Sequence, residues 1–212
     1  MSIENNLVRL EKLVERYLPE YLNMILGLRY DRVYHPSDVL LGLRRAPAAT
    51  RRHHSREGGL VEHYLEMWGA YLVMKPMFFK DGSPWNEAET DRRVLKGVIN
   101  HDLHKAYHYY RLVSEDPWKT EYSKSDTRTL VTDNHATLFI LEKWGIKMDL
   151  IDRNILLNSE GGWCEVETKE VASIAKLVYL LDDLSGNVLD RLKTGHHIRQ
   201  DVYDDKRVNP KM

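Results

Sequence analysis

Apolar residues recur every three or four positions through nearly the whole chain, and this spacing restricts the fold more than any other feature. The stripes are clearest over residues 7–22, 60–72 and 171–184. Residues with this spacing share one face of a helix, so each stripe predicts an amphipathic helix that buries one side. No segment shows a convincing alternation of apolar and polar residues, which would be typical of a half-buried strand. The sequence therefore predicts an all-α protein built as a single-domain helical bundle.

Prolines, glycines and capping residues predict where the helices begin and end. Pro19 should kink or divide the first helix, because proline lacks the backbone N–H group. The second helix should begin near Gly58 and end at the Lys75-Pro76 step. The remaining predicted helices are one that leads into His101, one capped by Ser125 or Asp126 that ends near Gly145, a short one over about 149–158, and a long one from about Thr168 to Leu192.

The length of the chain favours one domain. A chain of 212 residues is long enough for one well-buried core and short for two. We expect residues 1–50 to form an N-terminal helical segment packed on the core, residues 51–192 to form the core, and residues 193–212 to form a polar C-terminal tail.

The charge balance argues against one broad class of partner. Lys and Arg number 31 against 32 for Asp and Glu, and a formal net charge of −1 does not suit a surface that holds duplex nucleic acid. A small phosphorylated substrate is compatible with this balance. The composition does not decide the oligomeric state, and a homo-oligomer is one of the options.

Cysteine usage and the absence of targeting signals predict the compartment. Cys164 is the only cysteine, and the N-terminus lacks the apolar core of a signal peptide. No run approaches the roughly 18 to 20 apolar residues that a membrane span requires. We therefore expect a cytoplasmic protein with no membrane partner.

Residues 100–105 read NHDLHK, in a stretch whose flanks look like an ordinary amphipathic helix. His101 and Asp102 stand side by side where the buried face begins. Burying a carboxylate is costly unless a cation, a partner charge or hydrogen-bond donors compensate it. A metal ion would compensate it, which makes this motif the first candidate for a functional site.

Two further ligand-type side chains lie on other predicted helices. His63 stands beside the apolar face of one helix, and Asp182 stands in the middle of the last long one. A lone histidine on a helix is more often a core or surface residue, so the combination carries the inference rather than any single residue. A bundle can assemble a mixed nitrogen and oxygen site from facing side chains. Such ligands suit Mn, Fe, Co, Ni, Zn or Mg.

Four segments in order, GLVEH, NHDLHK, DNHATLFI and LVYLLDDLSG, resemble the successive motifs of the HD-domain superfamily of metal-dependent phosphohydrolases. The resemblance covers about residues 50–190. It implies a bundle with a metal site between helices, in which the ligands match His63, His101, Asp102 and Asp182. Asp183 is the alternative for the last position. The family activity implied is hydrolysis of phosphoester or phosphoanhydride bonds.

The chain also departs from the family patterns. Where many members have HDxGK, the glycine position holds His104, although Lys105 keeps the match to the broader HDxxK group. Two-metal members carry further histidines. His135 matches the first of these, whereas Glu160 stands near the place where a histidine pair is usual. His135 and Glu160 are therefore the candidate ligands of a second ion, and the number of ions stays open.

The basic stretch RRHHSREGG precedes the first ligand helix. It is either a solvated charge run that caps the helix or a clamp for substrate phosphate, since guanidinium groups bind phosphate oxygens in pairs. Arg56 and His54 are the better candidates for such a clamp. Lys105 lies one helical turn from Asp102, where it could neutralise phosphate charge, orient Asp102 or form a plain surface ion pair.

The resemblance implies hydrolysis of a nucleotide, of the nucleotidase or dNTP phosphohydrolase type, by a metal-activated water. Asp102, Lys105 and His135 are the candidate catalytic residues, with His135 as general acid or base if it is not a metal ligand. One alternative is a phosphodiesterase that acts on a cyclic nucleotide or on RNA 3' ends. Another is a non-catalytic binding protein that the metal stabilises.

Overall fold

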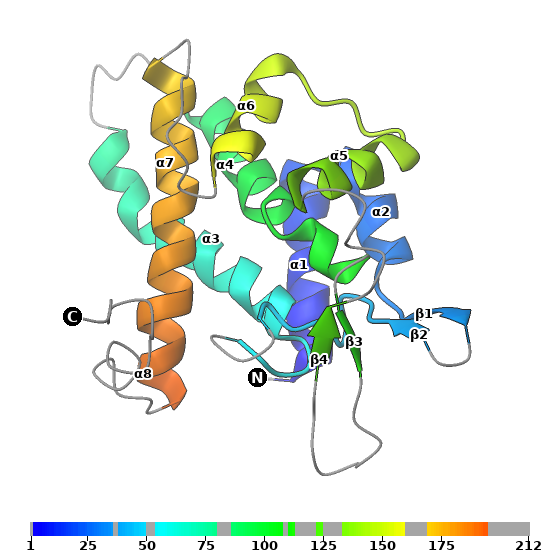
Figure 1. Ribbon diagram of the computed structural model, residues 1–212. Coiled ribbons are helices and arrows are strands. Elements are labelled where there is room, and N and C mark those ends of the chain that lie inside the picture. Colours follow the sequence, from blue (N-terminus) through cyan, green and yellow to red (C-terminus); the bar gives the residue numbers. More distant parts are fainter. Residues whose placement is uncertain are drawn as a thin grey trace, which may run out of the picture.

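Helices make up most of the described structure, and short strands form a small sheet beside them (Figure 1). This confirms the predicted helical bundle. The computed structural model of the chain describes residues 2–35, 38–49, 54–79, 86–107, 110–112, 122–124, 133–159 and 169–194.

The chain starts with helix α1 (Ile3–Tyr17), whose first turn is capped by the Ser2 side chain. The α-helix ends before Pro19, and a 3-10 turn, η1 (Pro19–Tyr21), leads into the short helix α2 (Leu22–Gly27). The predicted division at Pro19 is confirmed. Helix α1 packs against helix α3 (Gly59–Phe78).

Three helices carry the centre of the bundle: α3 (Gly59–Phe78), α4 (Glu87–Asn100) and α7 (Lys169–Asp183). Helix α7 packs against both α3 and α4, as Figure 1 shows. The apolar positions that these helices turn inward are fully buried, as the sequence stripes predict. They include Leu60, Val61, Val94, Val98, Val178 and Leu181.

Helix α3 begins at the predicted place and ends later than predicted. Gly58 caps it with a positive φ of 70°, a conformation that glycine adopts without steric cost. Pro76 lies inside the last turn, and the helix runs on to Phe78, so the predicted end at the Lys75-Pro76 step is wrong. Near a helix end a proline removes one hydrogen bond, and the Phe79 N–H group still bonds to the Lys75 carbonyl.

The next elements are the 3-10 turn η2 (Leu103–Ala106) and helices α5 (Asp133–Lys143) and α6 (Leu150–Asn158). Helix α5 packs against η2, and α6 packs against α4 and α7. Asp149 caps α6 through the Asp152 N–H group, so the short predicted helix is confirmed. The cap predicted at residue 125 or 126 lies outside the described residues.

The small sheet was not expected from the apolar pattern. Strands β1 (Arg32–His35), β2 (Asp38–Leu40), β3 (Tyr110–Leu112) and β4 (Tyr122–Lys124) pair antiparallel in that order. Each strand has three or four residues, which is too short for alternation to stand out in a sequence. The prediction of an all-α bundle is confirmed, and these short strands form a small sheet beside it.

The last long helix does not stay α-helical to its end. After α7 the chain passes through a π-helical turn, η4 (Leu184–Leu189), and then a short helix, α8 (Asp190–Thr194). Together these elements follow the helix predicted from about Thr168 to Leu192. Of the predicted polar tail, residues 195–212 lie outside the described residues.

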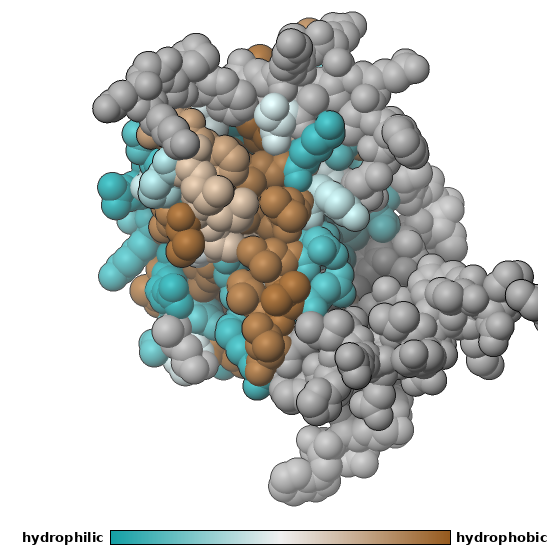
Figure 2. Space-filling model, turned by 90° about the vertical axis from the view of Figure 1, so that its left-hand side faces the viewer, coloured by the Kyte–Doolittle hydropathy of each residue, from teal (hydrophilic) through white to brown (hydrophobic). Residues whose placement is uncertain are grey.

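One face of the molecule carries exposed apolar side chains from α3 and α7, which gather as a band in Figure 2. Across the described ranges, no helix is long and apolar enough to cross a membrane. The exposed apolar residues on this face are Leu72, Val73, Met77 and Phe78 of α3 and Tyr179 and Leu180 of α7.

Candidate metal centre

Close packing of α4 on α7 brings the HD pair toward Asp182. Gly97 lies one turn before His101, and a Cβ atom at this glycine would lie only 2.6 Å from Cγ2 of Val178. Glycine therefore allows the two backbones to approach more closely than any other residue would. His101 follows directly as the C-cap of α4, with its N–H group bonded to the Gly97 carbonyl, and Asp102 comes next.

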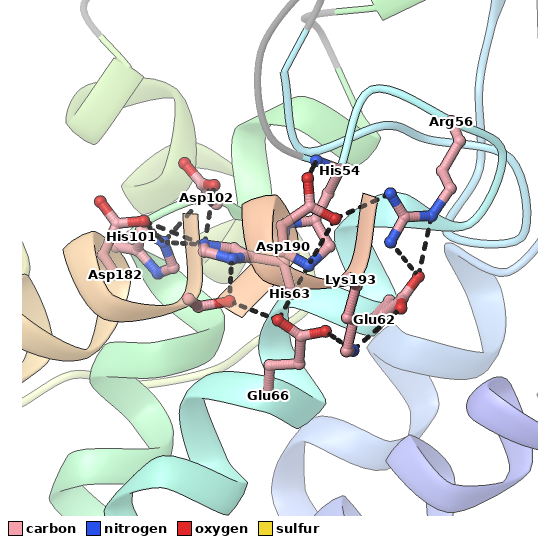
Figure 3. Close-up of polar contacts among 11 residues, drawn as sticks. His54, Arg56, Glu62, His63, Glu66, His101, Asp102, Asp182, Asp190 and Lys193 are labelled. Carbon is pink, nitrogen blue, oxygen red and sulfur yellow. Dashed lines mark hydrogen bonds and ion pairs between the residues drawn. The ribbon is translucent and has the colours of Figure 1, made fainter. Parts of the chain in front are cut away.

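Four side chains from three parts of the chain meet at this point (Figure 3). Nε2 of His63 lies 3.0 Å from Oδ1 of Asp182 and 3.4 Å from Nε2 of His101. Oδ2 of Asp102 lies 3.4 Å from the same His101 nitrogen and 3.8 Å from that of His63. His63, His101 and Asp102 are almost completely buried.

The remaining nitrogen of each histidine identifies its neutral tautomer. Nδ1 of His101 lies 2.8 Å from the Val98 carbonyl oxygen, which can only accept, so this nitrogen carries the proton. Nδ1 of His63 lies 2.9 Å from Oγ of Ser185, whose own hydrogen is donated to Glu66. The Ser185 oxygen therefore accepts from His63. In both neutral rings the lone pair is on Nε2.

Four acceptor atoms thus converge: two imidazole Nε2 atoms and two carboxylate oxygens. Such atoms repel one another unless a cation lies between them. The two histidine Nε2 atoms lie 3.4 Å apart, and each lies 3.0 to 3.8 Å from an oxygen of both carboxylates, which are separations that suit a shared ion. Ligands at about 2.1 Å from a tetrahedral ion lie about 3.4 Å apart. The donor set therefore fits a divalent metal ion of the borderline type that binds nitrogen and oxygen.

The electrostatics of the cluster keep its carboxylates ionised. Burial raises the pKa of Asp102, but the positive charge of Lys105 and the neighbouring His101 lower it by more. The net pKa therefore lies well below the usual range. Nζ of Lys105 lies 2.5 Å from Oδ2 of Asp102. Burial also raises the pKa of Asp182, but the close approach of His63 and His101 outweighs burial, so this pKa is lowered too.

The two histidines respond differently to the same surroundings. Complete burial lowers the pKa of His63, which favours its neutral, metal-binding form. Burial also lowers the pKa of His101, yet the adjacent Asp102 carboxylate raises it more, and the net shift is upward. The negative charge that holds a proton on His101 is the same charge that would attract a cation.

Of the two neighbouring aspartates in α7, the geometry brings Asp182 into the cluster. Asp183 is exposed and accepts a hydrogen bond from Nδ2 of Asn187 at 2.6 Å. The two side chains leave the helix about 100° apart, so only one can face α3 and α4.

Of the two candidate residues for a second ion, the structure describes His135. His135 is exposed in the first turn of α5, outside the group formed by His63, His101 and Asp102. Glu160 lies outside the described residues. His104 is buried, its Nε2 atom lies 3.7 Å from Oδ2 of Asp133, and burial lowers its pKa to about 4. The second ion stays a prediction.

Arg56 is held by carboxylates of the protein itself. Its guanidinium group bonds to Oε2 of Glu62 and to Oδ1 of Asp190, both at 2.8 Å. Figure 3 shows it at the far side of this network from His101 and Asp182. Arg56 thus ties the start of α3 to α8, and its role as a substrate clamp stays a prediction.

His54 lies in the same network and is fully buried. Its Nε2 atom lies 3.0 Å from Oε2 of Glu66, and its backbone N–H group bonds to Oδ2 of Asp190 at 3.0 Å. Lys193 bonds to Glu66 and lies 3.4 Å from Oε1 of Glu62. His54, Glu62 and Glu66 form a second group with metal-type atoms, but Arg56 and Lys193 already neutralise its carboxylates.

The sequence reasoning missed Ser185 and Glu66. Ser185 stands three residues after Asp182, and Glu66 stands three residues after His63. Side chains at this spacing lie on the same face of a helix, so the spacing from each expected ligand was the available signal.

Comparison with known proteins finds one distant relative of characterised activity. The chain is 32% identical over 108 residues to the dihydroneopterin 2',3'-cyclic phosphate phosphodiesterase of Methanocaldococcus jannaschii. The match covers 49% of this chain and 42% of the relative, so less than half of the relative's length is represented. No family model matches the sequence, and no solved structure matches it. The chain is therefore a distant homologue of a cyclic phosphate phosphodiesterase.

Proposed function

We propose that this chain is a metal-dependent phosphoesterase with His63, His101, Asp102 and Asp182 as the ligands of the principal ion. The observation that carries the proposal is the position of the His63 and His101 Nε2 atoms, which lie 3.4 Å apart and each 3.0 to 3.8 Å from an oxygen of both carboxylates. A divalent ion, when bound, supplies Lewis acidity to a phosphate oxygen and acidifies a water. The distant homology to a phosphodiesterase supports the same chemistry.

The residues around the cluster have separate tasks in this proposal. Lys105 holds the Asp102 carboxylate at 2.5 Å and adds positive charge next to the place where a phosphate would bind. A lysine in this position can also lower the charge density of a phosphate group. His135 is the candidate proton donor or acceptor, because an imidazole ring can both accept and donate a proton.

For the substrate we propose a small cyclic phosphodiester. The relative acts on a 2',3'-cyclic phosphate, which favours the phosphodiesterase alternative over the nucleotidase that the motifs alone suggested. The near-neutral chain, with a formal net charge of −1, is compatible with a small substrate of low charge.

A substrate panel tests this proposal. It would contain 2',3'-cyclic and 3',5'-cyclic nucleotides and nucleoside mono-, di- and triphosphates, each with Mg, Mn, Fe, Co, Ni or Zn, and 31P NMR would identify the product. We expect ring opening of a cyclic diester to a monoester without release of inorganic phosphate. Phosphate release from monoesters or triphosphates would favour the nucleotidase instead.

The matched control for the panel is the Asp102→Asn variant, which keeps the shape of the side chain and removes its charge. We expect it to lose both metal and activity. A wild-type protein that binds metal tightly but turns over none of these substrates would instead support a non-catalytic binding protein.

A further inference from the structure

The two ring nitrogens of His63 have different surroundings. Nε2 faces His101 and Asp182 in the proposed metal centre, whereas Nδ1 lies 2.9 Å from Oγ of Ser185. Only Nε2 takes part in the proposed metal site. The partner of Nδ1 therefore decides which nitrogen of His63 carries the proton.

Ser185 comes from the π-helical turn that follows α7. It is completely buried, and its carbonyl oxygen accepts the Asp190 N–H group five residues on, which is the hydrogen bond of a π-turn. Asp182 and Ser185, three residues apart in one helical segment, therefore reach the same imidazole. Single π-turns of this kind are frequent at functional sites.

The hydroxyl group of Ser185 has a defined direction. It donates to Oε2 of Glu66 at 3.1 Å, and an ionised carboxylate can only accept. The same Glu66 carboxylate is bonded to Nε2 of His54 at 3.0 Å and to Lys193. These contacts hold Glu66 in place and keep it ionised, so the Ser185 oxygen presents its lone pairs to His63.

Without this hydroxyl group, a competing arrangement would be favoured. Oδ1 of Asp182 lies 3.0 Å from Nε2 of His63, where it could accept a proton from that nitrogen. A His63 ring with its proton on Nε2 has no lone pair there for a metal ion. The proton on Nδ1 needs an acceptor, and the Ser185 oxygen lies 2.9 Å from this nitrogen.

We propose that Ser185 and Glu66 are positioning residues for the metal centre: Glu66 orients the Ser185 hydroxyl group, which keeps the His63 proton on Nδ1 and the lone pair on Nε2. The inference rests on the metal centre of the proposed function. It adds two residues that do not touch the ion and act through His63. Partners of this kind orient metal-binding histidines and raise their affinity.

Zn²⁺ affinity, measured by competition with a chromogenic chelator, tests the inference in the full chain. We expect Ser185→Ala and Glu66→Gln to weaken binding by about 10- to 100-fold, the usual effect of losing such a partner. The matched control is Glu62→Gln, which removes a carboxylate from the same ion-pair network. The Glu62 carboxylate pairs with Arg56 and Lys193 rather than with Ser185. Its affinity should stay within about twofold of the wild type.

The double variant shows whether Glu66 affects metal binding through Ser185 or independently of it. If Glu66 acts through Ser185, Ser185→Ala combined with Glu66→Gln should bind Zn²⁺ within about twofold of Ser185→Ala alone. Additive losses would show that Glu66 does not act through Ser185.

NMR of protein labelled with 15N at histidine gives a readout that is independent of affinity. In the metal-free wild type near pH 8 we expect the His63 proton on Nδ1, and in Ser185→Ala we expect it on Nε2. Unchanged affinity and an unchanged tautomer in Ser185→Ala would overturn this inference alone. A wild type that binds no ion would overturn the proposed function and this inference with it.

Discussion

The Nε2 atom of His63 in α3 lies 3.0 Å from the Oδ1 atom of Asp182 in α7. Two helices that are far apart in the sequence therefore meet at side chains that can share one ion. The adjacent Asp183 is turned toward solvent and bonds to Asn187. This contrast between neighbouring aspartates leads to a direct test.

Asp182→Asn should lose bound metal, and Asp183→Asn should keep it. The substitutions are chemically identical and one residue apart, so the second controls for the loss of charge from α7. We expect the affinity to fall by at least about 10-fold in the first variant, because the amide removes a charged ligand. Metal analysis after dialysis measures both, and equal metal content in the two would contradict the assignment.

His135 decides between one ion and two. Its exposed position in α5 leads us to expect one ion per chain in the wild type and in His135→Ala. If His135 transfers a proton, His135→Ala should lower kcat by roughly 10² to 10⁴-fold. A wild-type stoichiometry near two, which falls to one in His135→Ala and in Glu160→Ala, would show that both residues bind a second ion.

Arg56→Ala should lower stability more than it affects substrate binding. The substitution removes the guanidinium group, which lies 2.8 Å from a carboxylate oxygen of Glu62 and of Asp190. Because the guanidinium group is partly exposed, we expect a loss of about 1 kcal/mol in the free energy of unfolding. KM should change by less than about twofold. A much larger KM with unaltered stability would support the substrate clamp.

Gly97→Ala should push α4 away from α7 and disturb the metal centre. Its Cβ atom would lie 2.6 Å from Val178 and 3.2 Å from Ile155. We expect a loss of about 1 to 3 kcal/mol of stability, together with weaker metal binding. Gly69→Ala is the matched control in α3, where a Cβ atom meets nothing within 4 Å. That variant should be up to about 1 kcal/mol more stable. Chemical denaturation measures both.

The stabilising contribution of Glu66 to the fold should decrease in acid. Burial raises the pKa of its carboxyl group, but hydrogen bonds from His54 and Lys193 outweigh burial and bring it to about 2, below the usual 4.5. The ionised form therefore stabilises the fold above the ordinary pKa, and this contribution is lost as the pH falls toward 2.

We expect the free energy of unfolding of the wild type to exceed that of Glu66→Gln by about 1 to 3 kcal/mol at neutral pH. This difference should shrink below about pH 4. Urea unfolding of the metal-free protein at several pH values measures this difference. The exposed Glu15→Gln variant serves as the control and should follow the wild type. A difference that persists undiminished at about pH 3 would contradict the ionised role of Glu66.

The apolar spacing was sufficient to predict the helices and their buried faces. Leu60 and Val178 both stand in predicted stripes and are fully buried. Helix formation depends mainly on residues three and four apart, so a single sequence contains this information. The sheet was missed because its strands are short. In addition, the pairing of Leu40 with Arg111 joins segments that are far apart in the sequence, and local spacing does not reveal such a pairing.

The sequence also supplied the candidate ligands, because a histidine next to an aspartate on a buried face is costly without a compensating charge. It determined which kinds of side chain lie on which helix. Only the tertiary structure decided which of them meet. Asp182 rather than Asp183 faces His63 because α7 packs with that side against α3, and Arg56 bonds to Asp190 because α8 returns to the start of α3. Periodicity records which face of a helix is buried, whereas helix packing decides what that face contacts.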